Sequence, residues 1–184
     1  MATASAKRKT VGGHGNEKAK DSVRSLVSSE LSYLKKAEVL LLGSNKWVSE
    51  LARYFYRSNR KARLTILSFG RKELLDSVNA TSRFGNIRYA YSKGIYTGLP
   101  EDEFGLIVSY GTFDRMGNNK SISVLKELYR ISKPNGIVII IGDGIDYLYK
   151  HYNKSNFSSC EIIESKGLKY LKLVKVNEIS LLPQ

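Results

Sequence analysis

The sequence predicts a three-layer α/β sandwich built on a seven-stranded, mostly parallel sheet with an antiparallel C-terminal hairpin strand. Short apolar runs that stop at turn residues alternate with segments whose apolar residues recur every three or four positions. This alternation needs crossover connections, which place helices on both faces of a parallel sheet. The last two β-rich runs, 159–164 and 170–176, are too close in the chain for a crossover, so we expect them to form a hairpin.

The first half of the predicted domain alternates helices with strands. Apolar residues from Val23 to Leu34 lie at helical spacing, which predicts a helix over about 17–35. The continuous apolar run 38–42 stops at Gly43 and is typical of a strand buried on both faces. A helical stretch ending at Ser58-Asn59 comes next, and is followed by a strand at 63–69, a helix at 71–79 and a strand at 86–91.

The second half continues the alternation after a looser stretch. A β-rich run at 104–110 precedes apolar residues at helical spacing from Ile122 to Ile131. Pro134-Asn135-Gly136 is a breaker, so we expect it to separate this helix from the apolar strand 137–141. A short helix over 145–152 leads to the hairpin.

Composition sets the chemical class of the chain. Its 184 residues fit one domain, with residues 1–16 expected to form a disordered basic tail and residues 17–184 the folded domain. The single Cys160 permits no internal disulfide, and in its apolar strand we expect it to be a small buried hydrophobe. We therefore expect a reducing, cytoplasmic location. The longest apolar runs fall far short of the ~20 residues that a membrane-spanning helix needs. The two histidines and one cysteine do not have the spacing of metal ligands.

Two stretches carry a resemblance to a known family. Residues 99–109 read LPEDEFGLIVS, and residues 125–136 read LKELYRISKPNG. The first resembles the family pattern L-P-F-x-D-x-x-F-D-x-V-x-S, and the second L-x-E-x-x-R-x-L-K-P-G-G. With the seven-strand layout, they resemble the class I S-adenosylmethionine-dependent methyltransferases, in a type 11-like form with a Rossmann-like fold. The resemblance implies S-adenosylmethionine as cofactor.

The cofactor motifs of that family are degenerate in this chain. The glycine-rich loop D-x-G-x-G-x-G corresponds to residues 41–47, LLGSNKW, which keep only the first glycine. Ser68 stands where the family has the ribose-binding acid, and the stretch from Tyr91 to Lys93 has no carboxylate beside the adenine. The resemblance assigns cofactor binding to Gly43, Ser44, Asn45, Ser68, Phe69, Ser92 and Ser109.

Three further residues follow strands at the edge where open α/β folds bind ligands. These are Tyr110, Asp114 and Asp143. They are candidates for positioning a methyl acceptor, and the alternative interpretation is ordinary loop carboxylates or helix caps.

Basic residues give the chain a net charge of +13, which favours polyanionic partners such as RNA or DNA. They concentrate between positions 53 and 93 with tyrosines interleaved, and a solvated surface is the alternative interpretation. The candidate nucleic-acid-binding residues are Lys7, Arg8, Lys9, Arg57, Arg60, Lys61, Arg63, Arg71 and Lys72.

Two functions remain open from the sequence. One is a methyltransferase-like protein, with a degenerate cofactor site, that acts on or associates with nucleic acid. The other is a non-catalytic nucleic-acid-binding or scaffold subunit on the same fold, for which a protein partner is expected.

Overall fold

The sheet and its helices follow the predicted order along the chain. The computed structural model describes residues 21–26, 28–29, 38–43, 46–58, 62–165 and 168–176. Its strands are β1 (Glu38–Leu42), β2 (Arg63–Ser68), β3 (Ile87–Tyr91), β4 (Phe104–Tyr110), β5 (Ser132–Ile141), β6 (Ser159–Ser165) and β7 (Leu168–Val174). Its helices are α2 (Lys46–Ser58), α3 (Arg71–Thr81), α4 (Asn118–Ile131) and α5 (Ile145–His151), with 3₁₀ turns at Phe113–Arg115 and Tyr152–Ser155.

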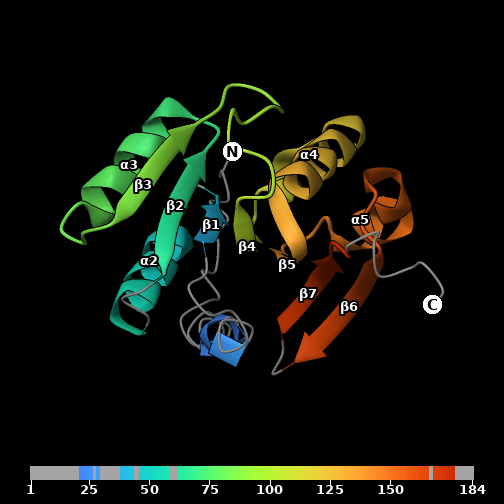
Figure 1. The fold of residues 1–184 in the computed structure, drawn as a ribbon, viewed down its shortest axis with the longest axis horizontal. Coiled ribbons are helices and arrows are strands. Elements are labelled where there is room, and N and C mark those ends of the chain that lie inside the picture. Colours follow the sequence, from blue (N-terminus) through green and yellow to red (C-terminus); the bar gives the residue numbers. More distant parts are fainter. Residues whose placement is uncertain are drawn as a thin grey trace, which may run out of the picture.

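The strands form one seven-stranded sheet in the order β3-β2-β1-β4-β5-β7-β6 (Figure 1). Pairs from β3 through β5 are parallel, whereas β7 pairs antiparallel with both β5 and β6. The predicted fold class and terminal hairpin are therefore confirmed. The chain order reverses between β1 and β4, which places the topological switch point of the sheet between these two strands.

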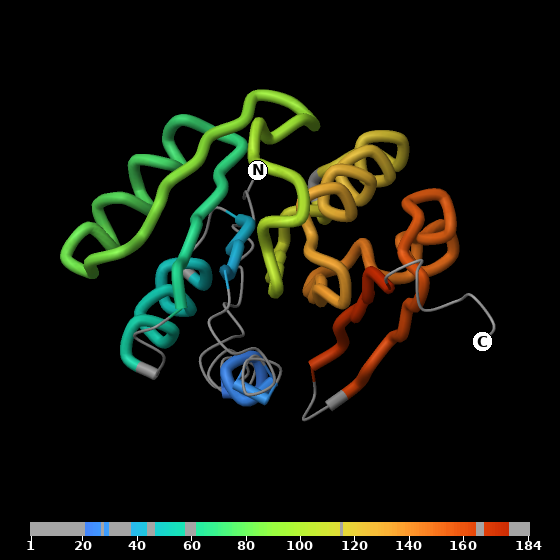
Figure 2. Tube along the Cα trace, viewed as in Figure 1, coloured from blue at the N-terminus to red at the C-terminus, as the bar shows by residue number. Residues whose placement is uncertain are grey.

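Two apolar layers cover the two faces of the sheet. On one face α2 buries Leu51 and Phe55 against β1, β2 and β4, together with Val23 from the helical residues 21–26. On the other face α4 buries Leu125 and Leu128, and α5 adds its own apolar residues. Figures 1 and 2 show α2 and α3 grouped beside β1 to β3, and α4 and α5 grouped toward the hairpin. The predicted 17–35 helix lies only partly within the described residues, and the 1–16 tail lies outside them.

One predicted boundary is wrong. Pro134-Asn135-Gly136 was expected to separate helix and strand, yet β5 begins at Ser132 and runs through it. The pairing with β4 shifts between Phe104 and Leu106, so the extra residues form a bulge, in which Asn135 has a φ of +60°. The breaker residues are accommodated in the sheet because the bulge releases them from regular pairing.

Candidate functional site

The carboxyl ends of β1 and β4 meet at the switch point, and Gly43 is fitted closely between them. Its φ is +134°, and a Cβ there would lie 2.8 Å from the carbonyl oxygen of Tyr110 and 3.1 Å from Val48. Glycine is therefore required where β1 turns toward α2. Of the predicted loop residues, Gly43 lies at this edge, whereas Ser44 and Asn45 lie outside the described residues.

An aromatic pair bridges the same point. Trp47, in the first turn of α2, stacks on Tyr110 with ring centroids 4.7 Å apart and an interplanar angle of 21°. Trp47 is only 8% exposed and belongs to the core layer of this face. Trp47 is not among the site residues predicted from the sequence. The signal was present, because the only tryptophan of the chain stands in the stretch where the resembled family has glycines.

Three buried hydroxyls at this edge have no hydrogen-bond partner among the described residues. They belong to Ser68 at the end of β2, Ser109 near the end of β4, and Thr112 just after it. Unpartnered buried polar groups are uncommon and point to a missing water or ligand. Two of them, Ser68 and Ser109, were predicted site residues, and Thr112 was not.

Ser92 and Phe69 have other surroundings. The Ser92 hydroxyl bonds the backbone oxygens of Gly94 and Tyr96, at 3.2 and 2.8 Å, and accepts from the Gly94 N–H. It therefore shapes the turn after β3. Phe69 is partly buried against the α4 face.

The three candidate acceptor-positioning residues share one neighbourhood. Asp114 Oδ1 accepts a hydrogen bond of 2.7 Å from the backbone N–H of Asp143, which ties the loop after β4 to the loop after β5. Burial raises the pKa of Tyr110, and the charges of Asp114 and Asp143 raise it further. The Tyr110 phenol therefore stays protonated at neutral pH, and its O–H is available as a hydrogen-bond donor.

A buried ion pair anchors the loop between β3 and β4. The Glu127 carboxylate accepts hydrogen bonds from the Thr97 N–H at 2.9 Å, the Thr97 hydroxyl at 2.6 Å and the Arg130 guanidinium at 2.8 Å. Arg130 also donates to the Leu99 carbonyl at 2.7 Å and lies 4.9 Å from the centre of the Tyr96 ring. Burial alone would raise the pKa of Glu127, but the bonds from Arg130 and Thr97 outweigh it and lower the pKa. Glu127 and Arg130 come from the stretch 125–136 that carries the family resemblance.

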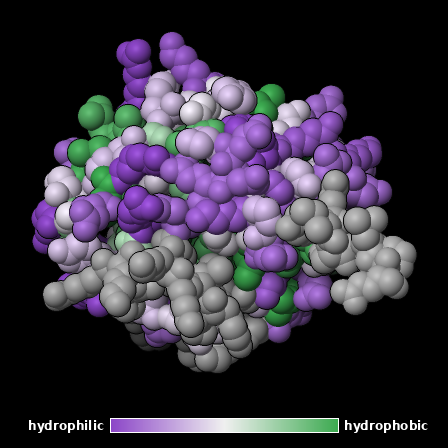
Figure 3. All heavy atoms as spheres, viewed as in Figure 1, coloured by the Kyte–Doolittle hydropathy of each residue, from purple (hydrophilic) through white to green (hydrophobic). Residues whose placement is uncertain are grey.

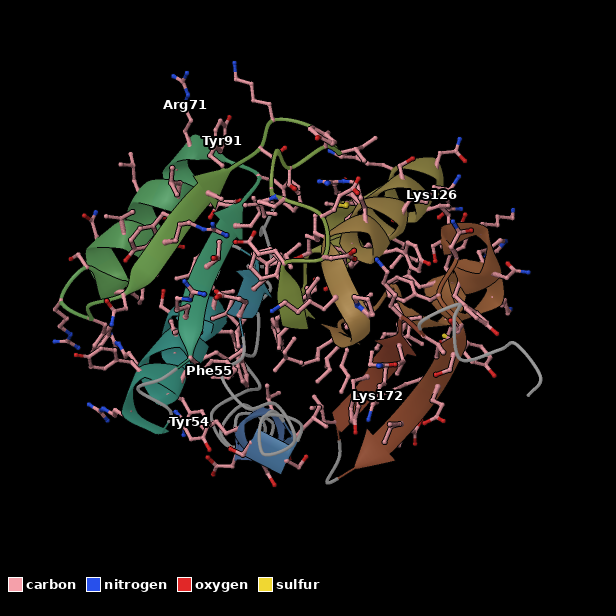
Figure 4. All side chains as sticks on the ribbon, in the orientation of Figure 1. Tyr54, Phe55, Arg71, Tyr91, Lys126 and Lys172 are labelled. Atoms are coloured by element: carbon pink, nitrogen blue, oxygen red, sulfur yellow. The ribbon has the colours of Figure 1, made fainter. Side chains whose placement is uncertain are left out.

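The basic residues of the 53–93 segment divide between two edges. Arg63 pairs with Glu38 and Arg88 pairs with Glu103 at the amino ends of the strands. Arg71 and Lys72 begin α3 at the carboxyl edge, and they are exposed with no ion pair among the described residues. Figure 4 shows Arg71 and Tyr91 together at this edge, with Tyr54 toward the opposite one.

The other predicted basic residues are less defined. Arg57, in the last turn of α2, is exposed near the amino edge. Lys7, Arg8, Lys9, Arg60 and Lys61 lie outside the described residues. Figure 3 shows that hydrophilic side chains cover much of the face seen in Figure 1.

Two cavities are lined by described residues. One, of about 790 Å³, opens at the amino edge among the Arg63–Glu38 and Arg88–Glu103 pairs. The other, of about 340 Å³, lies at the carboxyl edge between β5 and the hairpin and is lined in part by Asp143.

Three remaining expectations concern metal, membrane and the lone cysteine. The described residues contain no group of three or more histidine, cysteine or acidic side chains able to hold a metal ion. None of the described helices is both long and apolar enough to cross a membrane. Cys160 is partly buried in the edge strand β6, not fully buried as predicted, and burial beside Glu161 raises its pKa to about 12.

Comparison with known proteins gives structural matches only. The chain matches no known family profile and no curated protein sequence, so the type 11 subgroup remains a prediction. It is similar to a SAM-dependent methyltransferase from Aquifex aeolicus, with a TM-score of 0.66 and 15% identity over 90% of this chain and 95% of that one. It is also similar to a putative sarcosine dimethylglycine methyltransferase from Galdieria sulphuraria, with a TM-score of 0.57 and 16% identity over 74% of this chain.

A third similar structure, PigF with SAH, has a TM-score of 0.63 and 14% identity over 76% of this chain. The chain spans about half the length of the Galdieria protein and of PigF, at 54% and 50%. The strand order, the terminal hairpin and these matches agree that the chain has the fold of the S-adenosylmethionine-dependent methyltransferases.

Proposed function

We propose that this chain is an S-adenosylmethionine-dependent methyltransferase-like protein that acts on nucleic acid. The observation that carries the proposal is the carboxyl edge of the sheet. Buried hydroxyls without partners and exposed cations without counter-charges lie at this one edge, which is where open α/β sheets bind their ligands.

The described residues fit the polar half of such a cofactor. The Ser109 and Thr112 hydroxyls would bond its amino-acid portion, beside the close turn at Gly43, and Ser68 would bond its ribose. Phe69, directly after β2, would supply an apolar surface for the adenine ring. The cofactor supplies an electrophilic methyl group, and the Tyr110 phenol, held protonated, donates a hydrogen bond that orients the acceptor.

Nucleic acid is the acceptor class that the charges favour. Arg71, Lys72 and Lys93 are exposed around the ends of β2 and β3, and none forms an ion pair among the described residues. Tyr96, 68% exposed in the loop after β3, offers a ring on which a base can stack. Surfaces that combine cationic side chains with aromatic rings are typical of single-strand nucleic-acid binding.

A second candidate is a non-catalytic nucleic-acid-binding or scaffold subunit on the same fold. Ser68 favours it, because a hydroxyl there replaces a carboxylate and loses charge-assisted bonds to a ribose. The two candidates share the nucleic-acid surface and differ in methyl transfer. A transfer assay with radiolabelled S-adenosylmethionine and a pool of single-stranded RNA and DNA separates them, since the first function labels nucleic acid and the second does not.

Fluorescence anisotropy with labelled single-stranded RNA, measured across a range of salt concentrations, tests the surface. Each phosphate contact contributes about 0.7 to the slope of log affinity against log salt. An Arg71→Gln/Lys72→Gln variant should therefore lower the slope by about 1.4 if each side chain neutralises one phosphate.

The matched control is Lys126→Gln/Lys154→Gln, which removes the same charge from exposed positions on α4 and on the 3₁₀ turn Tyr152–Ser155 after α5. We expect its slope to be close to that of the native chain. Equal losses in both variants would contradict a surface at the ends of β2 and β3, and so would a larger loss from Arg57→Gln at the opposite edge.

A further inference from the structure

We infer that Trp47 is a gate at the proposed cofactor site, and that a ligand binds at the switch point only after the indole leaves its stack on Tyr110. The inference rests on the proposed function. The stack lies where β1 and β4 end side by side, and this is the point at which the chain order of the sheet reverses. Ligands of open α/β sheets bind in the crevice formed there. In this chain the stacked rings of Trp47 and Tyr110 border that point.

The contacts of the two rings show why the gate is closed in the free protein. Trp47 is 8% exposed and packs in the same apolar layer as Val48 and Leu51, so the indole is held by the core as well as by Tyr110. The Tyr110 ring is only partly buried and carries the solvent-facing side of the pair. The backbone of Tyr110 is also held in place, because its carbonyl packs closely against Gly43 at the end of β1.

A buried hydroxyl beside the Trp47–Tyr110 pair explains why a bound ligand would stabilise the open arrangement. The Thr112 hydroxyl, two residues after Tyr110, is buried and has no partner among the described residues. Thr112 Oγ1 lies 3.6 Å from the position that a Cβ of Gly43 would take, so this hydroxyl borders the same turn. A polar ligand that displaces the indole would give this hydroxyl a hydrogen-bond partner that the closed arrangement lacks.

A closed gate lowers the measured affinity by the fraction of molecules that are open. If the open arrangement is about one molecule in ten, the apparent dissociation constant is about tenfold weaker than that of an open site. Trp47→Leu keeps an apolar side chain in the core but removes the ring that stacks on Tyr110. We therefore expect this variant to bind about tenfold more tightly than the native chain.

The probe is S-adenosylhomocysteine, which cannot transfer a methyl group, titrated by calorimetry into the full chain. The matched control is Tyr56→Leu, which removes another paired aromatic ring from α2, one that lies 5.1 Å from Phe84 and away from the switch point. We expect Tyr56→Leu to bind like the native chain.

The native protein offers a second measurement that does not depend on a variant folding. Trp47 is the only tryptophan, so tryptophan fluorescence reports on it alone. Saturating S-adenosylhomocysteine should make the indole more accessible to quenching by acrylamide. Equal affinity of the native chain and Trp47→Leu, or an indole that stays equally protected in the complex, overturns the gate and leaves the proposed function standing. No binding by either protein at millimolar probe overturns the proposed cofactor as well.

Discussion

Replacing Glu127 by alanine should destabilise the fold by about 3 kcal/mol, because it leaves a partly buried cation and a loop without their shared acceptor. The Glu127 side chain is 6% exposed and that of Arg130 is 22% exposed. Removing one member of a buried ion pair costs about 3–5 kcal/mol. The lower end applies here, since Arg130 keeps its bond to the Leu99 carbonyl and has some contact with water.

Urea denaturation followed by circular dichroism measures this loss. In thermal denaturation followed by the same signal, a loss of about 3 kcal/mol should lower the melting temperature by about 6–12 °C, at about 2–4 °C per kcal/mol for a chain of this size. Glu127→Gln is the matched variant, since its amide oxygen still accepts from Thr97 while the charge is removed, and it should lose less. A loss below about 1 kcal/mol for the alanine variant would refute the assigned role of the anchor.

The same pair has a pH signature. The pKa of Glu127 is lower in the folded chain than in the unfolded one. The ionised carboxylate therefore stabilises the folded chain at pH values above the ordinary glutamate pKa, and this stabilisation is lost as pH falls through the folded pKa. The stability difference between the native chain and Glu127→Gln should therefore be constant near neutral pH and shrink below about pH 4. A difference that grows in acid would contradict the sign of this shift.

Three further predictions test the packing of the edge and the hairpin. Gly43→Ala should lower the free energy of unfolding by at least about 2 kcal/mol in urea denaturation. Its φ is +134°, and the new Cβ would lie 2.8 Å from the Tyr110 carbonyl oxygen. The control Gly85→Ala places a Cβ with nothing within 4 Å and should be close to neutral. Ser132→Ala should lower the free energy of unfolding by about 1 kcal/mol, because the Ser132 hydroxyl donates a 2.6 Å hydrogen bond to the Leu128 carbonyl of α4. Ser68→Ala removes a hydroxyl that has no partner among the described residues, so it should leave the stability of the free chain nearly unchanged. Cys160, with its pKa raised to about 12, should react with iodoacetamide at pH 8 far more slowly in the folded chain than in urea, and equal rates would contradict its burial.

The sequence predicts most of the fold because its signals are local. The apolar run 38–42 and the run 104–110 coincide with β1 and β4, since a continuous buried strand needs no information from elsewhere in the chain. The β5 boundary was missed because Pro134-Asn135-Gly136 is a breaker by local rules. The bulge that accommodates it depends on pairing with Phe104, a contact distant in sequence.

The candidate site depends on distant contacts to a greater extent. The stack of Trp47 on Tyr110 joins residues on either side of the β2–β3 region, and only the strand order brings them together. The strand order and direction also divide the basic residues between the two edges of the sheet. Arg63 begins β2 at the amino edge, whereas Arg71 follows β2 at the carboxyl edge, although the two are near in sequence. Charge in a sequence window therefore overstates the charge available to one ligand.

Calorimetric titration of the native full chain and of Trp47→Leu with S-adenosylmethionine tests the central claim most directly. The claim is that the carboxyl edge beside Gly43 and Tyr110 is a site for this cofactor. We predict one site per chain, with a dissociation constant of about 10–100 μM for the native protein and about tenfold tighter binding by the variant. Absence of binding heat from both proteins at about 1 mM cofactor would contradict the claim.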